Sequence, residues 1–360
     1  MNLFKDQAKN YRIVVTGGAG FIGSQLINKL LENKNLSIFN LDKLNYASDL
    51  NRINISSKEK RYKFLKIDLY DEKSVKEAIS SIDPDFIIHL AAESHVDRSL
   101  IEPNHFIESN ILGTFNLLQS TRKYLKNIEE SKRNLFRFLH VSTDEVYGSL
   151  GENGYFNEET KYNPTSPYSS SKASSDHLVN SWNHSFGIPT IISNCTNNYG
   201  PYQFPEKLIP LTILKCVKNL NIPIYGNGKN IRDWLHVDDH VDALLLIAQK
   251  GIPGQSYCVG SNSEKSNNEV VNKICEILDK HFKKDYSLKK LINYVEDRPG
   301  HDKRYAIDST KLQIELGWTP KYKFENGLEN TVNWYLNNIK WCNNILKKSN
   351  YDLDRIGLKI

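Results

Sequence analysis

Short apolar segments alternate with amphipathic segments through the first half of the chain. Each apolar segment has the length of a buried strand, whereas the segments between them repeat apolar residues three and four positions apart, which is the period of a helix. The predicted strands are 12–16, 36–41, 62–67, 85–90, 136–141 and 190–193, and helices are predicted over 71–80 and 103–125. Strands that alternate with helices predict an α/β fold, a doubly wound parallel sheet with helices on both faces.

The alternation weakens after residue 200, where prolines recur and helices then dominate. Helical patterns cover 268–282 and 325–336, and 234–250 with 256–259 predict a helix and a strand that return to the first sheet. We therefore expect a smaller C-terminal domain that the chain enters more than once. The predicted boundaries are 1–198 with 234–260 for the sheet domain, and 199–233 with 261–360 for the smaller domain.

Composition narrows the class of protein. The chain has 360 residues, 39% hydrophobic and 25% charged, which is typical of a globular protein. Its net charge of +5 is spread along the sequence, so no basic block predicts a nucleic-acid surface. No apolar run has membrane-spanning length, and residues 1–10 lack an apolar signal core. The five cysteines are widely spaced without a Cys-x-x-Cys pair, so we expect reduced thiols and a cytoplasmic protein.

A glycine pattern, Gly17-x-x-Gly20-x-x-Gly23, lies between the first predicted strand and the first predicted helix. Glycines there allow a tight turn and let a pyrophosphate approach the backbone and the positive end of the helix dipole. Asp42, at the end of the next strand, can bind the ribose diol of an adenosine and would repel a 2′-phosphate, which favours NAD over NADP. Asp68, after the third strand, is a less specific candidate because acids after strands are often helix caps.

Tyr168 and Lys172 are four residues apart at the start of a helical pattern, so they share one helix face. An ammonium group beside a phenol favours phenolate and lowers the phenol pKa, as would a positively charged nicotinamide ring. This pair predicts a base for a hydroxyl proton. Alone, a Tyr-x-x-x-Lys spacing is common; behind a dinucleotide loop it is specific.

The fifth predicted strand runs into Ser142-Thr143-Asp144-Glu145. Two adjacent carboxyl groups can divide the acid and base roles of an elimination if their environments separate their pKa values. The alternative is a solvated turn in which Thr143 caps a helix. In a continuing strand Asp144 would face away from Thr143 and Glu145, so shared chemistry requires the strand to end near Thr143 and the chain to curl.

Together these features resemble the extended short-chain dehydrogenase/reductase family, in its nucleotide-sugar dehydratase branch. The matching stretches run along nearly the whole chain: GGAGFIGS, LAAESHVDRS, STDEVYG, SPYSSSKASSDHLV, NCTNNYGPYQFPEKLIP, PIYGNGKNIRDWLHVDDH and DRPGHDKRYAID. The glycine loop and the Tyr/Lys pair are common to the superfamily, whereas the Thr-Asp-Glu triplet is more specific. The resemblance implies a Rossmann-type NAD-binding domain and a C-terminal nucleotide-sugar-binding domain.

The resemblance also implies site residues. The implied cofactor-binding residues are Gly17, Gly20, Phe21, Ile22, Gly23, Asp42, Asp68, Leu69, Ala91, Ala92, Tyr168 and Lys172. The implied substrate-binding residues, with Tyr225 stacked on the base and the arginines on the diphosphate, are Ser94, Thr143, Asn197, Lys207, Leu208, Tyr225, Arg232, Asn267, Arg298 and His301. Some cofactor or sugar contact is expected around Glu93, Ser94 and Asp97. No metal is expected, because the spacing of His236 and His240 is explained by a helix that opens with aspartates.

The reaction implied is the 4,6-dehydration of a nucleoside-diphosphate glucose, with dTDP-glucose as the expected substrate and UDP-glucose as the alternative. Tyr168 takes the C4 hydroxyl proton, Thr143 orients that hydroxyl, Glu145 removes the C5 proton and Asp144 protonates the departing C6 hydroxyl. A nucleotide-sugar 4-epimerase would not need the acidic pair, and a non-catalytic NAD-binding protein would not need Thr143, Tyr168 and Lys172. A homodimer through helices near 103–125 and 168–182 is also implied.

Overall fold

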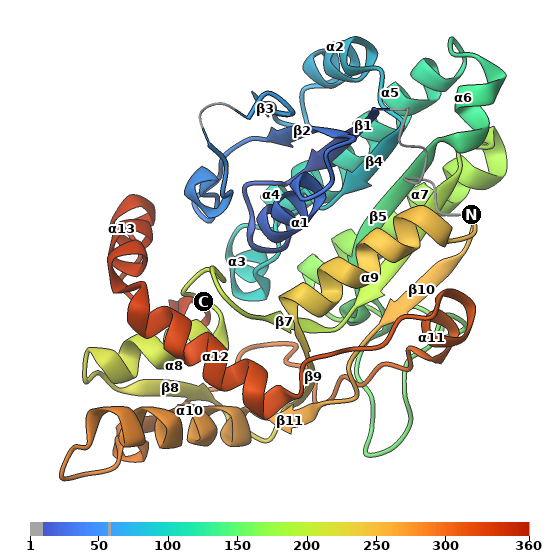
Figure 1. The fold of residues 1–360 in the computed structure, drawn as a ribbon. Helices are drawn as coiled ribbons and strands as arrows, with labels where there is room; N and C mark the ends of the chain where they lie inside the picture. Colours follow the sequence, from blue (N-terminus) through green and yellow to red (C-terminus); the bar gives the residue numbers. More distant parts are fainter. Residues whose placement is uncertain (1–9, 57–58, 360) are drawn as a thin grey trace.

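The centre of the molecule is a seven-stranded parallel sheet, and the computed structural model describes residues 10–56 and 59–359. The strand order is β10-β6-β5-β4-β1-β2-β3, so the order reverses between β1 and β4, which is the doubly wound topology expected from the sequence (Figure 1). The strands are β1 (Tyr11–Thr16), β2 (Leu36–Asp42), β3 (Tyr62–Lys66), β4 (Phe86–His89), β5 (Arg137–Thr143), β6 (Thr190–Cys195) and β10 (Ser256–Val259).

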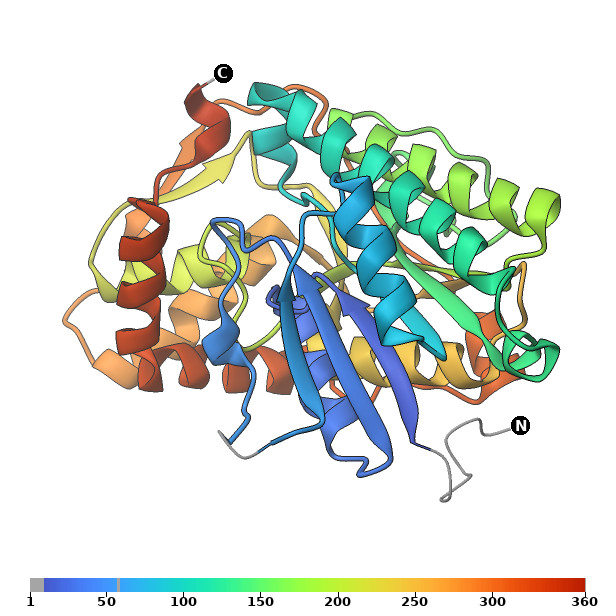
Figure 2. The same ribbon diagram turned by 90° about the horizontal axis from the view of Figure 1, so that it is seen from above.

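Helices cover both faces of this sheet (Figures 1 and 2). Along β1, Ile13 and Val15 pack into one core while Val14 packs into the other, because successive side chains of a strand point to opposite faces. The first face carries α1 (Phe21–Leu31), α9 (Val237–Lys250) and α11 (Thr310–Leu316), and the second carries α2 (Glu72–Ile82), α5 (Gly113–Leu125) and α7 (Pro167–Phe186). Strands buried on both sides explain the continuous apolar segments in the sequence.

Helix α7 begins and ends where its sequence dictates. Ser166 and Ser169 form a reciprocal capping box, Pro167 takes the first helical position, and Gly187 ends the helix in the left-handed conformation. Tyr168 therefore sits in the first turn, close to the carboxyl end of β5. The predicted helix over 103–125 consists of α4 (Pro103–Phe106), a π-helical segment η2 (Ile107–Leu112) and α5. Asn110 of η2 donates to the Ser171 hydroxyl at 2.8 Å and fixes this segment against α7.

A smaller lobe lies beyond the carboxyl ends of the strands, at the lower left of Figure 1. Its core is formed mainly by α8 (Leu208–Val217), α10 (Asn267–Phe282) and α12 (Phe324–Asn337), which pack around the parallel pair β8 (Ile222–Tyr225) and β12 (Ile292–Val295). A three-stranded sheet of β7 (Asn197–Tyr199), β9 (Ile231–His236) and β11 (Glu264–Ser266) joins it to the main sheet domain. The remaining elements are α3 (Val96–Ile101), α6 (Glu130–Leu135), α13 (Ile339–Ser349), η1 (Leu50–Arg52), η3 (Asp144–Tyr147), η4 (Leu288–Leu291) and η5 (Ile356–Lys359).

Two segments differ from the sequence-based expectation. The helix predicted over 234–250 begins only at Val237, because 231–236 form strand β9 and His236 accepts a capping hydrogen bond from the amide of Asp238. Residues 310–318 lie in the range assigned to the smaller domain, yet Leu312, Leu316 and Trp318 are buried in the core of the main sheet. Long-range packing determines both where this helix begins and which core residues 310–318 join. Among the described residues, no helix is long and apolar enough to cross a membrane.

Candidate active site

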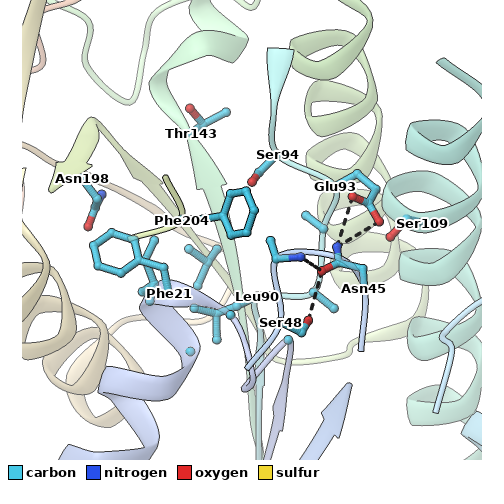
Figure 3. Close-up of a pocket in the computed structure, with 18 of the residues that line it drawn as sticks. Phe21, Asn45, Ser48, Leu90, Glu93, Ser94, Ser109, Thr143, Asn198 and Phe204 are labelled. Carbon is cyan, nitrogen blue, oxygen red and sulfur yellow. Dashed lines mark hydrogen bonds between the residues drawn. The ribbon is translucent and has the colours of Figure 1, made fainter. Parts of the chain in front are cut away.

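One long cavity runs across the carboxyl ends of the strands, from the glycine loop to the first residues of the smaller lobe (Figure 3). Open α/β sheets bind ligands at this edge, where the strand order reverses. Every predicted cofactor-binding residue lines this cavity, as do the five predicted catalytic residues: Gly17, Gly20, Phe21, Ile22, Gly23, Asp42, Asp68, Leu69, Ala91, Ala92, Thr143, Asp144, Glu145, Tyr168 and Lys172. The fold thus brings together residues that are more than a hundred positions apart.

The glycine loop has no room for larger side chains. A Cβ at Gly23 would lie 2.3 Å from the carbonyl oxygen of Gly17, and Gly17 itself has a φ of +71°. Helix α1 starts directly after Gly20, and no side chain caps its first amides, which leaves them available to an anion. These features fit the pyrophosphate of a dinucleotide.

Asp42 is held at the end of β2 by three donors. Its Oδ2 accepts from the amide of Ala19 at 3.0 Å, and its Oδ1 accepts from the amide of Leu44 and the hydroxyl of Ser48 at 2.8 and 3.1 Å. The carboxylate therefore joins the glycine loop to the loop after β2 and faces the cavity, where a ribose diol would bind.

Sequence reasoning missed most of the loop after β2. Asn45 donates to both carboxylate oxygens of Glu93, at 3.2 and 3.3 Å (Figure 3). Lys43 forms an ion pair with the same carboxylate at 3.0 Å. Tyr46 donates to Glu206 at 2.7 Å across the cavity. A cluster of Asn, Ser and Asp after a strand does indicate a structured turn, but its distant acidic partners have no local signal.

The Thr143-Asp144-Glu145 triplet has the geometry that shared chemistry requires. Strand β5 ends at Thr143, and a 3₁₀ turn begins at Asp144, which confirms the predicted curl. The Thr143 hydroxyl accepts from the amide of Glu145 and donates to Asp144 Oδ1, both at 3.3 Å. Thr143 therefore also caps the turn, as the alternative interpretation of this segment predicted. Capping does not exclude contact with a ligand, because the turn itself lines the cavity.

The two carboxyl groups have different electrostatic environments. Burial, together with the neighbouring Glu145, raises the pKa of Asp144 to about 8, so Asp144 holds a proton at neutral pH. Burial also raises the pKa of Glu145, but Arg298, Arg232 and Lys207 oppose that rise. One group is therefore a proton donor, and the other is surrounded by cations that favour its charged form.

Tyr168 and Lys172 both reach the cavity, but the predicted direction of the phenol pKa is wrong for the protein by itself. Burial and the nearby carboxylate of Glu145 raise the pKa of Tyr168 well above its usual value, and a hydrogen bond with Thr143 opposes this. The Lys172 ammonium donates to the carbonyl of Val141 at 2.9 Å rather than to the phenol. Spacing on a helix places two side chains on one face, but it does not determine which acceptor the lysine reaches.

The predicted nucleotide-binding residues fall into two groups. Ser94, Asn197 and Lys207 line the cavity together with Thr143, and Lys207 donates to the carbonyl of Ser94 at 2.9 Å. The others are outside the cavity lining: Leu208, Tyr225, Arg232, Asn267, Arg298 and His301. Leu208 and Asn267 open helices α8 and α10, adjacent to the cavity residue Lys207 and to β11.

Charged contacts tie several of these outer residues to the main sheet domain. Arg298 Nη1 lies 2.6 Å from Asp97 Oδ1, while Tyr225 donates to Asp97 Oδ2 at 2.8 Å. Arg232 donates to the carbonyl of Asp302 at 3.0 Å and lies 4.2 Å from the ring centre of Tyr305. The Nε of Arg298 is buried without a hydrogen-bond partner in the described residues, which fits an arginine that still has an anion to bind.

Comparisons with known proteins agree with this geometry. The family model described as GDP-mannose 4,6 dehydratase matches residues 14–331. The dTDP-glucose 4,6-dehydratase of Escherichia coli is 48% identical over 360 aligned positions, which cover 96% of this chain and 99% of that protein. Solved structures of dTDP-glucose 4,6-dehydratases superpose closely. The Bacillus anthracis enzyme in complex with NAD has a TM-score of 0.82 at 41% identity, and the Streptomyces venezuelae enzyme with NAD and TYD bound has 0.85 at 37%. Each alignment covers 93% of this chain and 99% of the solved one. The chain belongs to the GDP-mannose 4,6-dehydratase family of extended short-chain dehydrogenase/reductases, among the dTDP-glucose 4,6-dehydratases.

Proposed function

We propose that this protein is an NAD-dependent lyase that converts dTDP-glucose to dTDP-4-keto-6-deoxy-glucose. The observation that carries the proposal is the pair Asp144 and Glu145, held side by side in the cavity with separated electrostatic environments. Hydride transfer alone needs neither carboxyl group, whereas loss of water needs a proton donor and a proton acceptor. The close similarity to dTDP-glucose 4,6-dehydratases names the substrate.

The glycine loop, the uncapped end of α1 and Asp42 fit NAD. NAD held there would supply the acceptor for the C4 hydride of the sugar and the donor of the hydride to C6. Thr143 orients the C4 hydroxyl, and Tyr168 accepts its proton. Burial and Glu145 disfavour the phenolate form of Tyr168. A positive charge on Lys172, one helical turn away, would favour it.

Elimination follows from the environments of the two acids. The new C4 ketone acidifies the C5 proton, which Glu145 removes. Asp144, which burial keeps protonated at neutral pH, donates a proton to the departing C6 hydroxyl. Glu145 then returns its proton to C5 when the hydride arrives at C6. Arg298, Arg232 and Lys207 hold the charge of Glu145 and extend toward the proposed diphosphate site.

Three other functions compete with this one. A UDP-glucose 4,6-dehydratase would use the same chemistry and differ only at the base. A nucleotide-sugar 4-epimerase leaves Asp144 and Glu145 without a role, and a non-catalytic NAD-binding protein leaves the whole triplet and Tyr168 without one. Incubation of the purified protein with dTDP-glucose and with UDP-glucose separates them. A 4-keto-6-deoxy product from dTDP-glucose supports the proposal; epimerised sugar, or no turnover of either substrate, would sink it.

Glu145→Gln tests the assignment of the base. We expect this variant to bind NAD as the wild type does and to lose most elimination, because an amide cannot take the C5 proton. Removing a general base lowers a rate by about 10²–10⁴-fold. Product formation followed by mass spectrometry, with NAD affinity from fluorescence titration, measures both effects. Product formation at the wild-type rate by this variant would refute the role of Glu145.

We also infer a cytoplasmic homodimer. The predicted interface helices, over 103–125 and 168–182, lie side by side as η2, α5 and α7 (Figure 2). Ile107 and Leu112 of η2 are 45% and 38% exposed, and Phe186 at the end of α7 is 42% exposed. Large apolar side chains at such positions are typical of a contact surface. The five cysteines are free thiols, which suits a reducing compartment. Light scattering at twice the chain mass would support the dimer.

A further inference from the structure

A buried polar cluster lies directly behind the cavity wall at Lys172. The Lys172 ammonium lies 3.4 Å from Nε2 of His140, a side chain of β5 that points away from the cavity. The same Nε2 lies 3.1 Å from Oδ1 of Asp176. Lys172, His140 and Asp176 are 4%, 1% and 0% exposed, so all three are shielded from water.

The second oxygen of Asp176 is firmly held. Its Oδ2 accepts hydrogen bonds from the Ser142 hydroxyl at 2.8 Å, the Tyr162 hydroxyl at 2.9 Å and the Asn194 amide at 3.3 Å. Hydrogen bonds donated to a carboxylate oxygen favour the charged form of the group. Asp176 follows Lys172 by one helical turn on α7, so the helix fixes the spacing between the two charges.

His140 separates these charges as a neutral ring. Burial, helped by the positive charge of Lys172, lowers the pKa of His140 to about 4. Its Nε2 can accept from Lys172 or donate to Asp176, but a neutral imidazole nitrogen does not do both at once. The ring therefore lies between the two charges without carrying a charge of its own.

Burial works against the charge of Lys172, and Asp176 is the strongest group that opposes it. Desolvation lowers the pKa of Lys172, while Asp176 and then Cys195 raise it. A buried ammonium without a counter-charge releases its proton. Such a loss would remove the positive charge that favours the phenolate of Tyr168.

We propose that Asp176 and His140 are positioning residues that keep Lys172 charged at the cavity wall, one helical turn from Tyr168. This proposal rests on the proposed function, because it concerns the lysine of that reaction. Neither residue lines the cavity or reaches the sugar, and both act through Lys172. The other titratable groups around this cluster come from β4, η3, the loop before α7, β6 and β10, and they are His89, Tyr147, Tyr162, Cys195 and Cys258.

Asp176→Asn of the full chain tests the counter-charge. In protein made with isotopically labelled lysine, NMR follows the titration of Lys172, whose signal is assigned by its loss in Lys172→Met. We expect Asp176→Asn to lower the Lys172 pKa by about one unit or more. The alkaline limb of the rate–pH profile with dTDP-glucose, where Lys172 loses its proton, should move down by a similar amount, with roughly tenfold lower turnover on that limb. Tyr162→Phe is the matched control, because it removes one hydrogen bond to Asp176 and leaves the charge.

Two results would overturn the proposal. One is an Asp176→Asn protein with lower activity but an unchanged Lys172 titration, which would mean that Asp176 supports the fold without affecting the charge of Lys172. The other is an equal shift in Tyr162→Phe. If Asp176→Asn does not fold, two variants of His140 provide the test. His140→Leu should lower the Lys172 pKa. His140→Gln can still accept a hydrogen bond from Lys172 and should keep the Lys172 pKa near its wild-type value. Equal titrations in this second pair contradict the proposal. Because NMR reads Lys172 without turnover, a failed dehydratase assay does not affect this test.

Discussion

The two ends of the cavity are built in different ways. At the cofactor end, Gly17, Gly23 and Asp42 lie on one strand–loop–helix–strand unit, and main-chain geometry defines the site. Beyond the other end, at the proposed nucleotide-sugar site, Tyr225 and Arg298 come from separate segments of the smaller lobe, and side-chain contacts with Asp97 of the sheet domain hold them.

This difference predicts how each end fails. A site formed by main-chain atoms is lost when an added side chain clashes with the backbone, because no neighbouring side chain can move to relieve the clash. A site made of charged side chains loses affinity in steps, because each removed partner leaves the others in place. Changes at the two ends should therefore separate binding of NAD from binding of the sugar nucleotide.

Gly23→Ala should have the largest effect. Its Cβ would meet the Gly17 carbonyl oxygen at 2.3 Å and Gly18 Cα at 2.8 Å, and both are backbone atoms that cannot rotate away. We expect NAD binding to be lost in calorimetric titration, with the fold destabilised by about 1–3 kcal/mol. Gly151→Ala is the control, because no heavy atom lies within 4 Å of its Cβ position. NAD affinity within twofold of the wild type in Gly23→Ala would contradict a backbone-defined site.

Asp97→Asn should have an intermediate effect, confined to the other end. It removes the negative charge 2.6 Å from Arg298 and weakens the hold on Tyr225. We expect the KM for dTDP-glucose to rise roughly tenfold, equivalent to about 1.4 kcal/mol, with little change in NAD affinity. Steady-state kinetics and NAD titration measure the two separately.

Glu264→Gln is the matched control for this change, because Glu264 pairs with Arg304 at 2.6 Å away from the cavity lining. If Asp97→Asn weakens NAD as much as the sugar nucleotide, the two ends are one cooperative site and the comparison fails.

At the proposed cofactor end, every residue named from the sequence lines the cavity. A glycine loop between a strand and a helix, followed by Asp42 at the next strand end, forms a local unit whose geometry follows from backbone rules. The doubly wound fold followed from periodicity in the same way, and strand geometry set the condition that the chain must curl after Thr143 if the three residues share one site. Local rules do not reach across the chain, however. Glu206, which receives a hydrogen bond from Tyr46, is 160 positions away from it in the sequence.

Two errors have the same physical origin. The predicted fall in the Tyr168 pKa considered Lys172 alone, whereas burial and Glu145 dominate in the folded chain. The last three residues of strand β9, 234–236, fall in the range predicted as a helix, while pairing of β9 with β7 and β11 makes them a strand. In both cases tertiary contacts overrode a correct local preference.

Tyr46→Phe should have the smallest effect, and it tests the junction of the two ends. Tyr46 follows β2 at the cofactor end, and its hydroxyl donates to Glu206 of the smaller lobe at 2.7 Å. Phenylalanine keeps the ring beneath the Arg98 guanidinium, 3.7 Å from the ring centre, and Arg98 still pairs with Glu206 at 3.0 Å. Only one hydrogen bond to a charged group is lost, worth about 1.5–3 kcal/mol at most.

Because that bond joins the two ends, NAD affinity and the KM for dTDP-glucose should worsen together by a few-fold, unlike the separate effects at Gly23 and Asp97. Tyr155→Phe, at a 55% exposed tyrosine, controls for loss of a hydroxyl. A change in only one of the two affinities would place Tyr46 wholly at that end of the cavity.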